Sequence, residues 1–173
     1  MRKVEVVPYD PGWVGEFESQ ARRLASVLGD EAVAIHHYGS TAIPGLCAKP
    51  IIDILVEVKD IEAIDALNAE MEALGYEARG EQGFSGRRYF VREHDERRTH
   101  HVHMYETGHA EIERWLRFRD YLLAHPDEAE AYGNLKRSLA EQFPYDALRY
   151  NEGKTSFVRR VDELARAWRE DRD

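Results

Sequence analysis

The stretch from Tyr38 to Val58 constrains the fold more than any other part of this 173-residue chain. Tyr38-Gly39-Ser40-Thr41 is typical of a strand that ends in a glycine turn followed by a serine cap. Residues 49–58 (KPIIDILVEV) have the continuous apolar character of a buried strand, yet they carry Asp53 in the middle. A small-residue turn that exposes backbone N–H groups beside an aspartate is suited to holding a phosphate and its metal ion.

The rest of the pattern predicts an α+β fold: a mixed β-sheet with flanking helices and a C-terminal helical portion. We expect strands at residues 32–38, 51–58, 76–79, 88–92 and 100–106, with a short edge segment at 4–7. We expect helices at residues 11–28, 61–74, 111–124, 127–143 and about 151–169. Because the chain shows no repeats and no long linkers, we expect a single domain over residues 1–173.

Composition narrows the function classes. A net charge of −9 argues against general nucleic-acid binding. No apolar run reaches membrane-spanning length and the N-terminus lacks the apolar stretch of a signal peptide, so we expect a cytoplasmic protein without a membrane partner. The single cysteine, Cys47, excludes an internal disulfide and is interpreted as a packing residue. No apolar stripe is clearly left over for a partner, so the sequence leaves the oligomeric state open.

Arginines gather in one part of the predicted sheet, where acidic residues interrupt them. We interpret this cluster as a solvated hairpin. Its members are Arg87, Arg88, Arg92, Arg97 and Arg98.

Two strands place ionisable side chains on faces where apolar ones are expected. Alternation puts Asp53 on one face with Leu55 and Glu57, and a carboxylate there is expected to be ion-paired, bonded to backbone or bound to metal. His101 and His103 share a face of their own strand, which is a common arrangement of metal ligands and of acid–base groups. Half-buried structural histidines are the alternative, and the metal hypothesis requires that this face adjoin Asp53.

Three predicted C-terminal helices each carry one cation on or beside the apolar stripe: Arg119, Lys136 and Lys154. A single long basic side chain in such a position usually extends its charge to solvent. Three together favour a shared anionic target, either a phosphate-bearing ligand or the Asp53 carboxylate. Lys49, four residues before Asp53, adds a fourth cation at the turn.

These features resemble the GrpB family, whose members are also called glutamate-rich proteins. The resemblance implies a nucleotidyltransferase-like fold over nearly the whole chain. Related domains occur fused to dephospho-CoA kinase, which points to coenzyme A metabolism. The resemblance rests on the following motifs: Tyr9-Asp10-Pro11 with Trp13 and Phe17, residues 39–46 (GSTAIPGL), Ala48-Lys49-Pro50, Ile52-Asp53-Ile54, His100-His101-Val102-His103, residues 118–122 (FRDYL), His125-Pro126, Tyr132 with Leu135-Lys136, and Tyr150 with Lys154 and Phe157.

The resemblance also implies site roles. In active nucleotidyltransferases a Gly-Ser turn grips the triphosphate and two carboxylates one residue apart bind divalent metal, with a third from a neighbouring strand. Gly39, Ser40 and Thr41 match the turn, and Asp53 matches the first carboxylate. Leu55 stands at the second position, and Glu57 lies about 13 Å along the strand from Asp53.

His101 and His103 would replace the missing ligands. The cofactor expected from the resemblance is Mg²⁺ or Mn²⁺, and imidazole ligands would shift the preference toward softer ions such as Zn²⁺.

The leading hypothesis is a nucleotidyltransferase-like protein that binds a nucleotide or other phosphate ligand, with metal-dependent nucleotidyl transfer as its catalytic form. In it, Asp53, His101 and His103 bind metal or act as acid–base groups, and Lys49, Arg119, Lys136 and Lys154 neutralise phosphate charge. The alternatives are an inactive nucleotide-binding module, a metal-dependent phosphoesterase built on Asp53 and the two histidines, and an accessory domain that acts through a partner.

Overall fold

The computed structural model describes residues 2–173, which divide into two compact units. The sheet unit consists of Pro11–Gly39 and Ile51–Glu113, and the helical unit consists of Met1–Asp10, Ser40–Pro50 and Arg114–Asp173. Each unit thus combines segments that are distant in the sequence, and each is described by itself.

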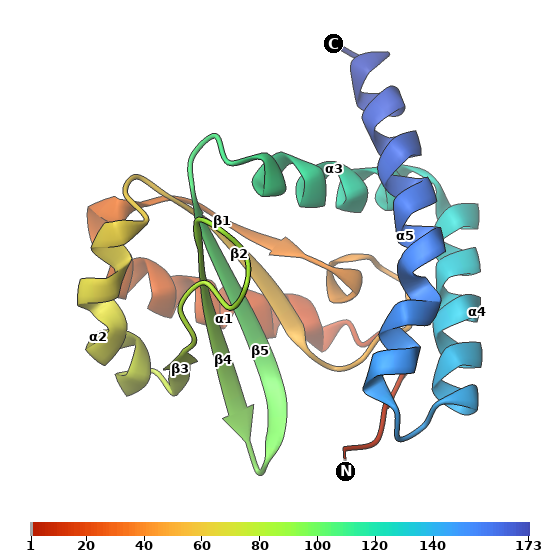
Figure 1. Cartoon of the computed structure of the whole chain (residues 1–173), viewed down its shortest axis with the longest axis horizontal. Helices are drawn as coiled ribbons and strands as arrows, with labels where there is room; N and C mark the ends of the chain where they lie inside the picture. Colours follow the sequence, from red (N-terminus) through yellow and green to blue (C-terminus); the bar gives the residue numbers. More distant parts are fainter. Residues whose placement is uncertain (1) are drawn as a thin grey trace. The chain divides into compact units, whose positions relative to one another are not determined.

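A five-stranded mixed sheet forms the centre of the sheet unit, with strand order β1-β2-β5-β4-β3 (Figure 1). Only β2 and β5 pair in parallel among these strands, and every other neighbouring pair is antiparallel. The strands are β1 (Ala32–Tyr38), β2 (Ile52–Val58), β3 (Tyr76–Ala78), β4 (Arg87–His94) and β5 (Arg97–Glu106).

One face of this sheet is apolar and packs against helices. Ile52, Ile54 and Val56 of β2 are at most 1% exposed, and α1 (Gly12–Leu28) contacts β1 and β2. Phe17 of α1 stacks on His37, and the Tyr76 hydroxyl donates to Gln20 Oε1 at 2.9 Å. The ionisable residues of the candidate site therefore lie on the opposite face.

Three helices make up most of the helical unit: α3 (Ala110–Ala124), whose first residues belong to the sheet unit, α4 (Pro126–Gln142) and α5 (Ala147–Glu170). α4 and α5 lie side by side (Figure 1). Cys47 is 4% exposed within this unit, as expected of a packing residue. The main core of the unit consists of Ile43, Leu46, Phe118, Tyr121, Leu122, Ala129, Tyr132, Val161 and Ala165.

The predicted α+β architecture is confirmed, with its mixed sheet, flanking helices and C-terminal helical portion. Three local predictions differ from the structure. Residues 4–7 contribute a single β-bridge, Val7 to Ala48. Residues 61–74 form a 3-10 helix, Glu62–Leu67, followed by the short α2, Asn68–Ala73. The last helix begins at Ala147, before the predicted start, because the Asp146 side chain caps it by accepting from the Arg149 backbone N–H at 3.1 Å.

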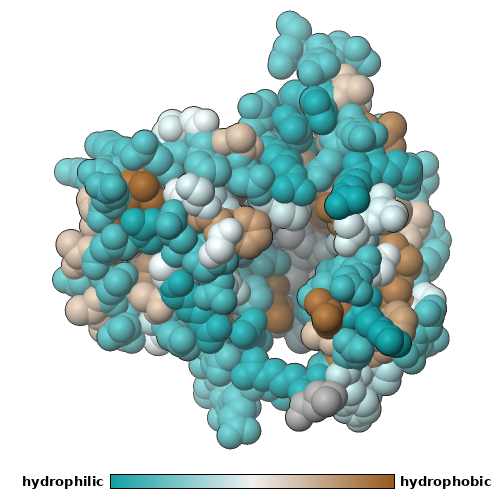
Figure 2. Space-filling model, in the orientation of Figure 1, coloured by the Kyte–Doolittle hydropathy of each residue, from teal (hydrophilic) through white to brown (hydrophobic). Residues whose placement is uncertain are grey.

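No helix within residues 2–173 is both long enough and apolar enough to cross a bilayer. The surface visible in Figure 2 is mostly hydrophilic, and its hydrophobic residues form small separate spots. On the face shown, the hydropathy therefore gives no sign of an extended apolar patch.

Two helical glycines test the packing. A Cβ atom on Gly15 of α1 would meet nothing within 4 Å, whereas one on Gly153 of α5 would overlap the Leu139 side chain. We expect Gly15→Ala to stabilise the protein by about 0.5–1 kcal/mol through helix propensity. Gly153→Ala should lower stability, because overpacking costs about 1–3 kcal/mol. Urea unfolding of both variants measures the difference, and equal gains would contradict the packing of α4 against α5.

Candidate functional site

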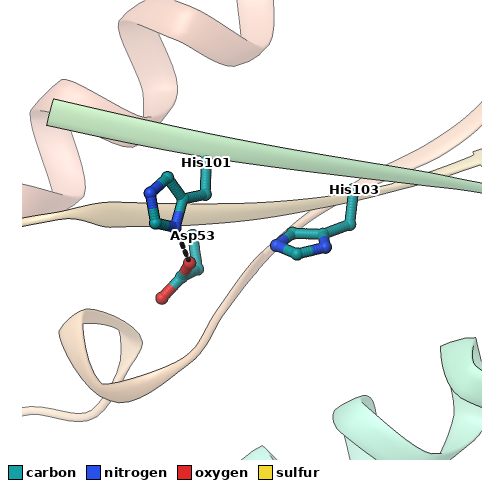
Figure 3. Close-up of side chains that lie close together, drawn as sticks. All are labelled: Asp53, His101 and His103. Atoms are coloured by element: carbon teal, nitrogen blue, oxygen red, sulfur yellow. Dashed lines mark ion pairs between the residues drawn. The ribbon is translucent and has the colours of Figure 1, made fainter. Parts of the chain in front are cut away.

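The parallel pairing of β2 with β5 brings the ionisable residues together. In its register Asp53 lies opposite His101, and Leu55 lies opposite His103. Since opposite residues of paired strands point to the same face, both histidines share a face with Asp53. Figure 3 shows the His101 ring beside the carboxylate and His103 turned toward the same spot. The condition that the metal hypothesis required is thus met.

The three side chains form a compact donor set. One ligand atom from each lies within 4.8 Å of the others, and His101 Nδ1 lies 3.6 Å from Asp53 Oδ1. The Asp53 and His101 side chains keep 28% and 19% of their surface exposed, so solutes can reach them. Ligands of a tetrahedral Zn²⁺ lie about 3.4 Å apart. Shifts of about 1 Å would therefore bring the three onto one ion.

The chemistry of this set fits a divalent cation. One carboxylate and two imidazoles suit Zn²⁺ or Mn²⁺ better than Mg²⁺, which prefers oxygen ligands. The ring nitrogen of His101 that faces Asp53 is Nδ1. A neutral His101 would therefore bind the cation through Nδ1 and keep its proton on the buried Nε2.

Gly39 allows the chain to pass directly over Asp53. Its φ is +73°, and a Cβ atom built on it would lie 2.5 Å from Asp53 Oδ2 and 3.0 Å from Asp53 Cβ. Only glycine combines that backbone conformation with so close an approach. The predicted neighbourhood of the glycine turn and the strand-borne aspartate is therefore present in the sheet unit.

Burial keeps the surrounding groups neutral. It lowers the pKa of His103 to about 4, with Arg87 and His101 acting in the same direction and Asp53 opposing them. Burial also raises the pKa of Tyr38 well above its usual value, and the nearby Asp53 charge adds to this. At pH 7 His103 is thus a neutral imidazole, and Tyr38 presents a neutral hydroxyl.

The structure provides one carboxylate at this centre. Leu55 is fully buried in β2, and Glu57 pairs with His36, with 3.6 Å between Glu57 Oε2 and His36 Nε2. Glu57 is thus engaged at another point of the same face. This donor set suits one ion, in contrast to the paired ions of two-metal enzymes.

Sequence reasoning missed Arg87, Tyr38 and Tyr89 as neighbours of the site. The interpretation of the arginine cluster as solvated is wrong for Arg87, which is 6% exposed. Arg87 Nη1 lies 3.4 Å from His103 Nδ1. The rings of Tyr38 and Tyr89 lie 5.7 Å and 4.9 Å from that of His103. Alternation along β4 carries the missing signal, since it puts Arg87 and Tyr89 on one face.

The predicted phosphate-binding lysines lie in the helical unit. Lys49 and Lys154 place their Nζ atoms 4.5 Å and 4.6 Å from the centre of the Tyr150 ring. Lys136 is 2% exposed, and its Nζ lies 4.7 Å from the centre of the Tyr132 ring. Two ammonium groups therefore share one aromatic ring, and a third lies on another.

The other residues predicted to contact phosphate, Arg119, Ser40 and Thr41, have different surroundings from the lysines. Arg119 forms an ion pair at 2.9 Å with Asp120, which also pairs with Arg169 at 2.8 Å. Ser40 begins a short 3-10 helix (Ser40–Ala42) and is partly exposed, whereas Thr41 is 1% exposed. Ser40 is therefore more accessible to a ligand than Thr41.

Comparison with known proteins identifies the family. The family model described as GrpB protein matches residues 3–164. The chain belongs to the GrpB family. It is 48% identical over 172 residues to UPF0157 protein YqkA of Bacillus subtilis, covering 99% of this chain and 50% of that protein. The crystal structure of conserved protein GrpB from Enterococcus faecalis matches with 42% identity and a TM-score of 0.90, covering 95% of this chain and 99% of that one.

The chain spans about half the length of YqkA. A protein named dephospho-CoA kinase, from Mycolicibacterium paratuberculosis, is 31% identical over 189 residues that cover 95% of this chain and 46% of that protein. The structure of the Cid1 poly(U) polymerase matches at 10% identity with a TM-score of 0.42, covering 78% of this chain and 43% of that one. A likeness of that degree carries no argument about this chain.

Gly39→Ala tests the contact between turn and carboxylate. We expect a loss of about 1–3 kcal/mol in unfolding free energy, because the new methyl group meets Asp53 in a backbone conformation that alanine resists. Gly45→Ala is the matched control, since Gly45 has φ +82° and nothing within 4 Å of a Cβ. Chemical denaturation of both measures the difference, and equal losses would show that the Asp53 contact is unimportant.

Proposed function

We propose that this protein binds a phosphate-bearing small molecule of the nucleotide class together with one divalent cation. The observation that carries the proposal is the approach of Asp53, His101 and His103, whose ligand atoms lie within 4.8 Å of one another on a partly exposed face. A bound cation would attract phosphate oxygens, because divalent ions in such sites commonly complete their coordination with substrate phosphate and water.

We also propose that lysines of the helical unit bind phosphate. Lys49 and Lys154 hold two positive charges against one tyrosine ring. Each ammonium group is attracted to a face of the ring, and an anion carrying more than one charge would attract both. Lysine also binds phosphate as a mobile point charge, which suits several phosphate oxygens at once.

The buried Leu55 favours binding over two-metal chemistry. With Leu55 at the second position, Asp53 is the carboxylate of this donor set, which suits one cation. The proposal therefore requires binding only, as in an inactive nucleotide-binding module. Nucleotidyl transfer is the catalytic form of the same proposal. Phosphoester hydrolysis is the second candidate, because one cation with open coordination positions can activate water.

The name of the dephospho-CoA kinase relative suggests a further probe. That protein contains a region similar to 95% of this chain. Dephospho-CoA carries an adenosine diphosphate group, so it belongs to the ligand class that we propose. It should be compared with the four common nucleoside triphosphates.

Calorimetry tests the proposal on the metal-stripped chain, titrated with ATP, CTP, GTP, UTP and dephospho-CoA, with and without Mg²⁺, Mn²⁺ or Zn²⁺. We expect the cation to raise the affinity of at least one ligand, and Asp53→Asn to abolish that gain by weakening cation binding. Glu57→Gln is the matched control, since Glu57 lies on the same strand and face but pairs with His36. Metal-independent affinity that Asp53→Asn leaves unchanged would contradict the proposal.

The same calorimetry also tests the proposed role of the lysines. Lys154→Gln should weaken nucleotide binding and its dependence on salt, because it removes a charge that attracts phosphate. Its affinity for the cation alone should stay unchanged. Lys59→Gln serves as the control at an exposed lysine. Equal nucleotide affinities for the two variants would contradict a phosphate-binding role of Lys154.

A further inference from the structure

Arg87 is a buried cation whose position is fixed from several sides. It is 6% exposed and begins β4. Its Nε donates to the Glu81 carbonyl oxygen and its Nη2 to the Gln82 carbonyl oxygen, both at 3.0 Å. The guanidinium carbon also lies 4.2 Å and 4.7 Å from the ring centres of Phe84 and Tyr89. Since these contacts hold the whole guanidinium group, turning away from His103 would be costly.

The remaining nitrogen of this group, Nη1, points at His103 and lies 3.4 Å from Nδ1. A guanidinium carries only donors and stays protonated in proteins. The Nδ1 atom that receives it must therefore offer a lone pair, which leaves the proton of the neutral imidazole on Nε2. In Figure 3 the ring nitrogen farther from Cβ, which is Nε2, is turned toward Asp53.

This tautomer conflicts with metal ligation by His103. Ligation through Nε2 needs its lone pair, so the proton would have to move to Nδ1 and face the Arg87 N–H groups. Histidine ligands normally donate from the second nitrogen to a carboxylate or a carbonyl oxygen. Here that nitrogen, Nδ1, faces the fixed guanidinium donor of Arg87. The positive charge of Arg87 also disfavours a second cation nearby.

We propose that Arg87 holds His103 as the Nε2–H tautomer, so that Asp53 and His101 bind the cation while His103 donates a hydrogen bond to an anionic oxygen of the ligand. This inference rests on the function proposed above and assigns a distinct role to each histidine. Arg87 acts as a positioning residue, since it works through His103. A phosphate oxygen bound to the cation would then also accept from His103.

The tautomer can be measured directly in the metal-free protein. A long-range proton–nitrogen NMR correlation spectrum distinguishes the protonated from the unprotonated ring nitrogen, and comparison with His103→Gln assigns the signals. We expect a protonated Nε2 and an unprotonated Nδ1 for His103. A protonated Nδ1 would overturn the proposal. Because this result needs no metal, it stays informative if the proposed function fails.

Metal titration supplies the second readout. Arg87→Gln should bind Zn²⁺ or Mn²⁺ about tenfold more tightly than the wild-type protein, because His103 becomes able to ligate and a nearby positive charge is lost. Arg88→Gln is the matched control, since Arg88 pairs with Asp65. Unchanged or weaker metal affinity in a folded Arg87→Gln protein would overturn the proposal.

A third comparison separates the two histidines. His103→Gln keeps an N–H donor near the position of Nε2 and should retain the cation, whereas His101→Gln should lose it. The His103→Gln variant should also keep more of its ATP affinity in the presence of the cation than His103→Leu, which has no donor. Loss of the cation in both glutamine variants would show that His103 is a ligand and would overturn the assignment.

Discussion

The candidate site depends on one pairing, the parallel register of β2 against β5. It sets Asp53 beside His101 and keeps Ile52, Ile54 and Val56 on the opposite, apolar face. A slip of one residue would turn the apolar side chains of β2 away from α1 and move Asp53 to the other face. The burial that stabilises the sheet therefore also holds the ionisable groups together. The packing of the sheet is therefore sufficient to fix the main geometry of the site.

Much of this arrangement could be predicted from the sequence because it is periodic. Alternation placed Asp53 on the opposite face from Ile52 and Ile54, and it placed His101 and His103 on a common face. The glycine turn was predictable as well, since a left-handed backbone beside a strand end favours Gly39. The adjacency of the two strands does not follow from periodicity, and here the resemblance to a family supplied the expectation.

Contacts made by irregular backbone could not be predicted. Arg87 is buried where its side chain donates to the carbonyl oxygens of Glu81 and Gln82. Nothing in the surrounding charge pattern specifies the backbone conformation of these two residues. The arginine therefore looked solvated in the sequence. Asp120 is a similar case, since it pairs with its neighbour Arg119 and also with Arg169, 49 positions further along the chain. Such pairings depend on tertiary structure, which local patterns do not encode.

The most direct test of the account is anomalous diffraction from crystals grown with Mn²⁺ and the nucleotide that binds best in calorimetry. We expect one peak within about 2.0–2.3 Å of an Asp53 carboxylate oxygen and a His101 ring nitrogen. His103 should lie outside the coordination sphere, within hydrogen-bond distance of a ligand oxygen. A map without a peak at Asp53, from crystals in which the nucleotide is visible, would contradict the proposed metal-dependent binding.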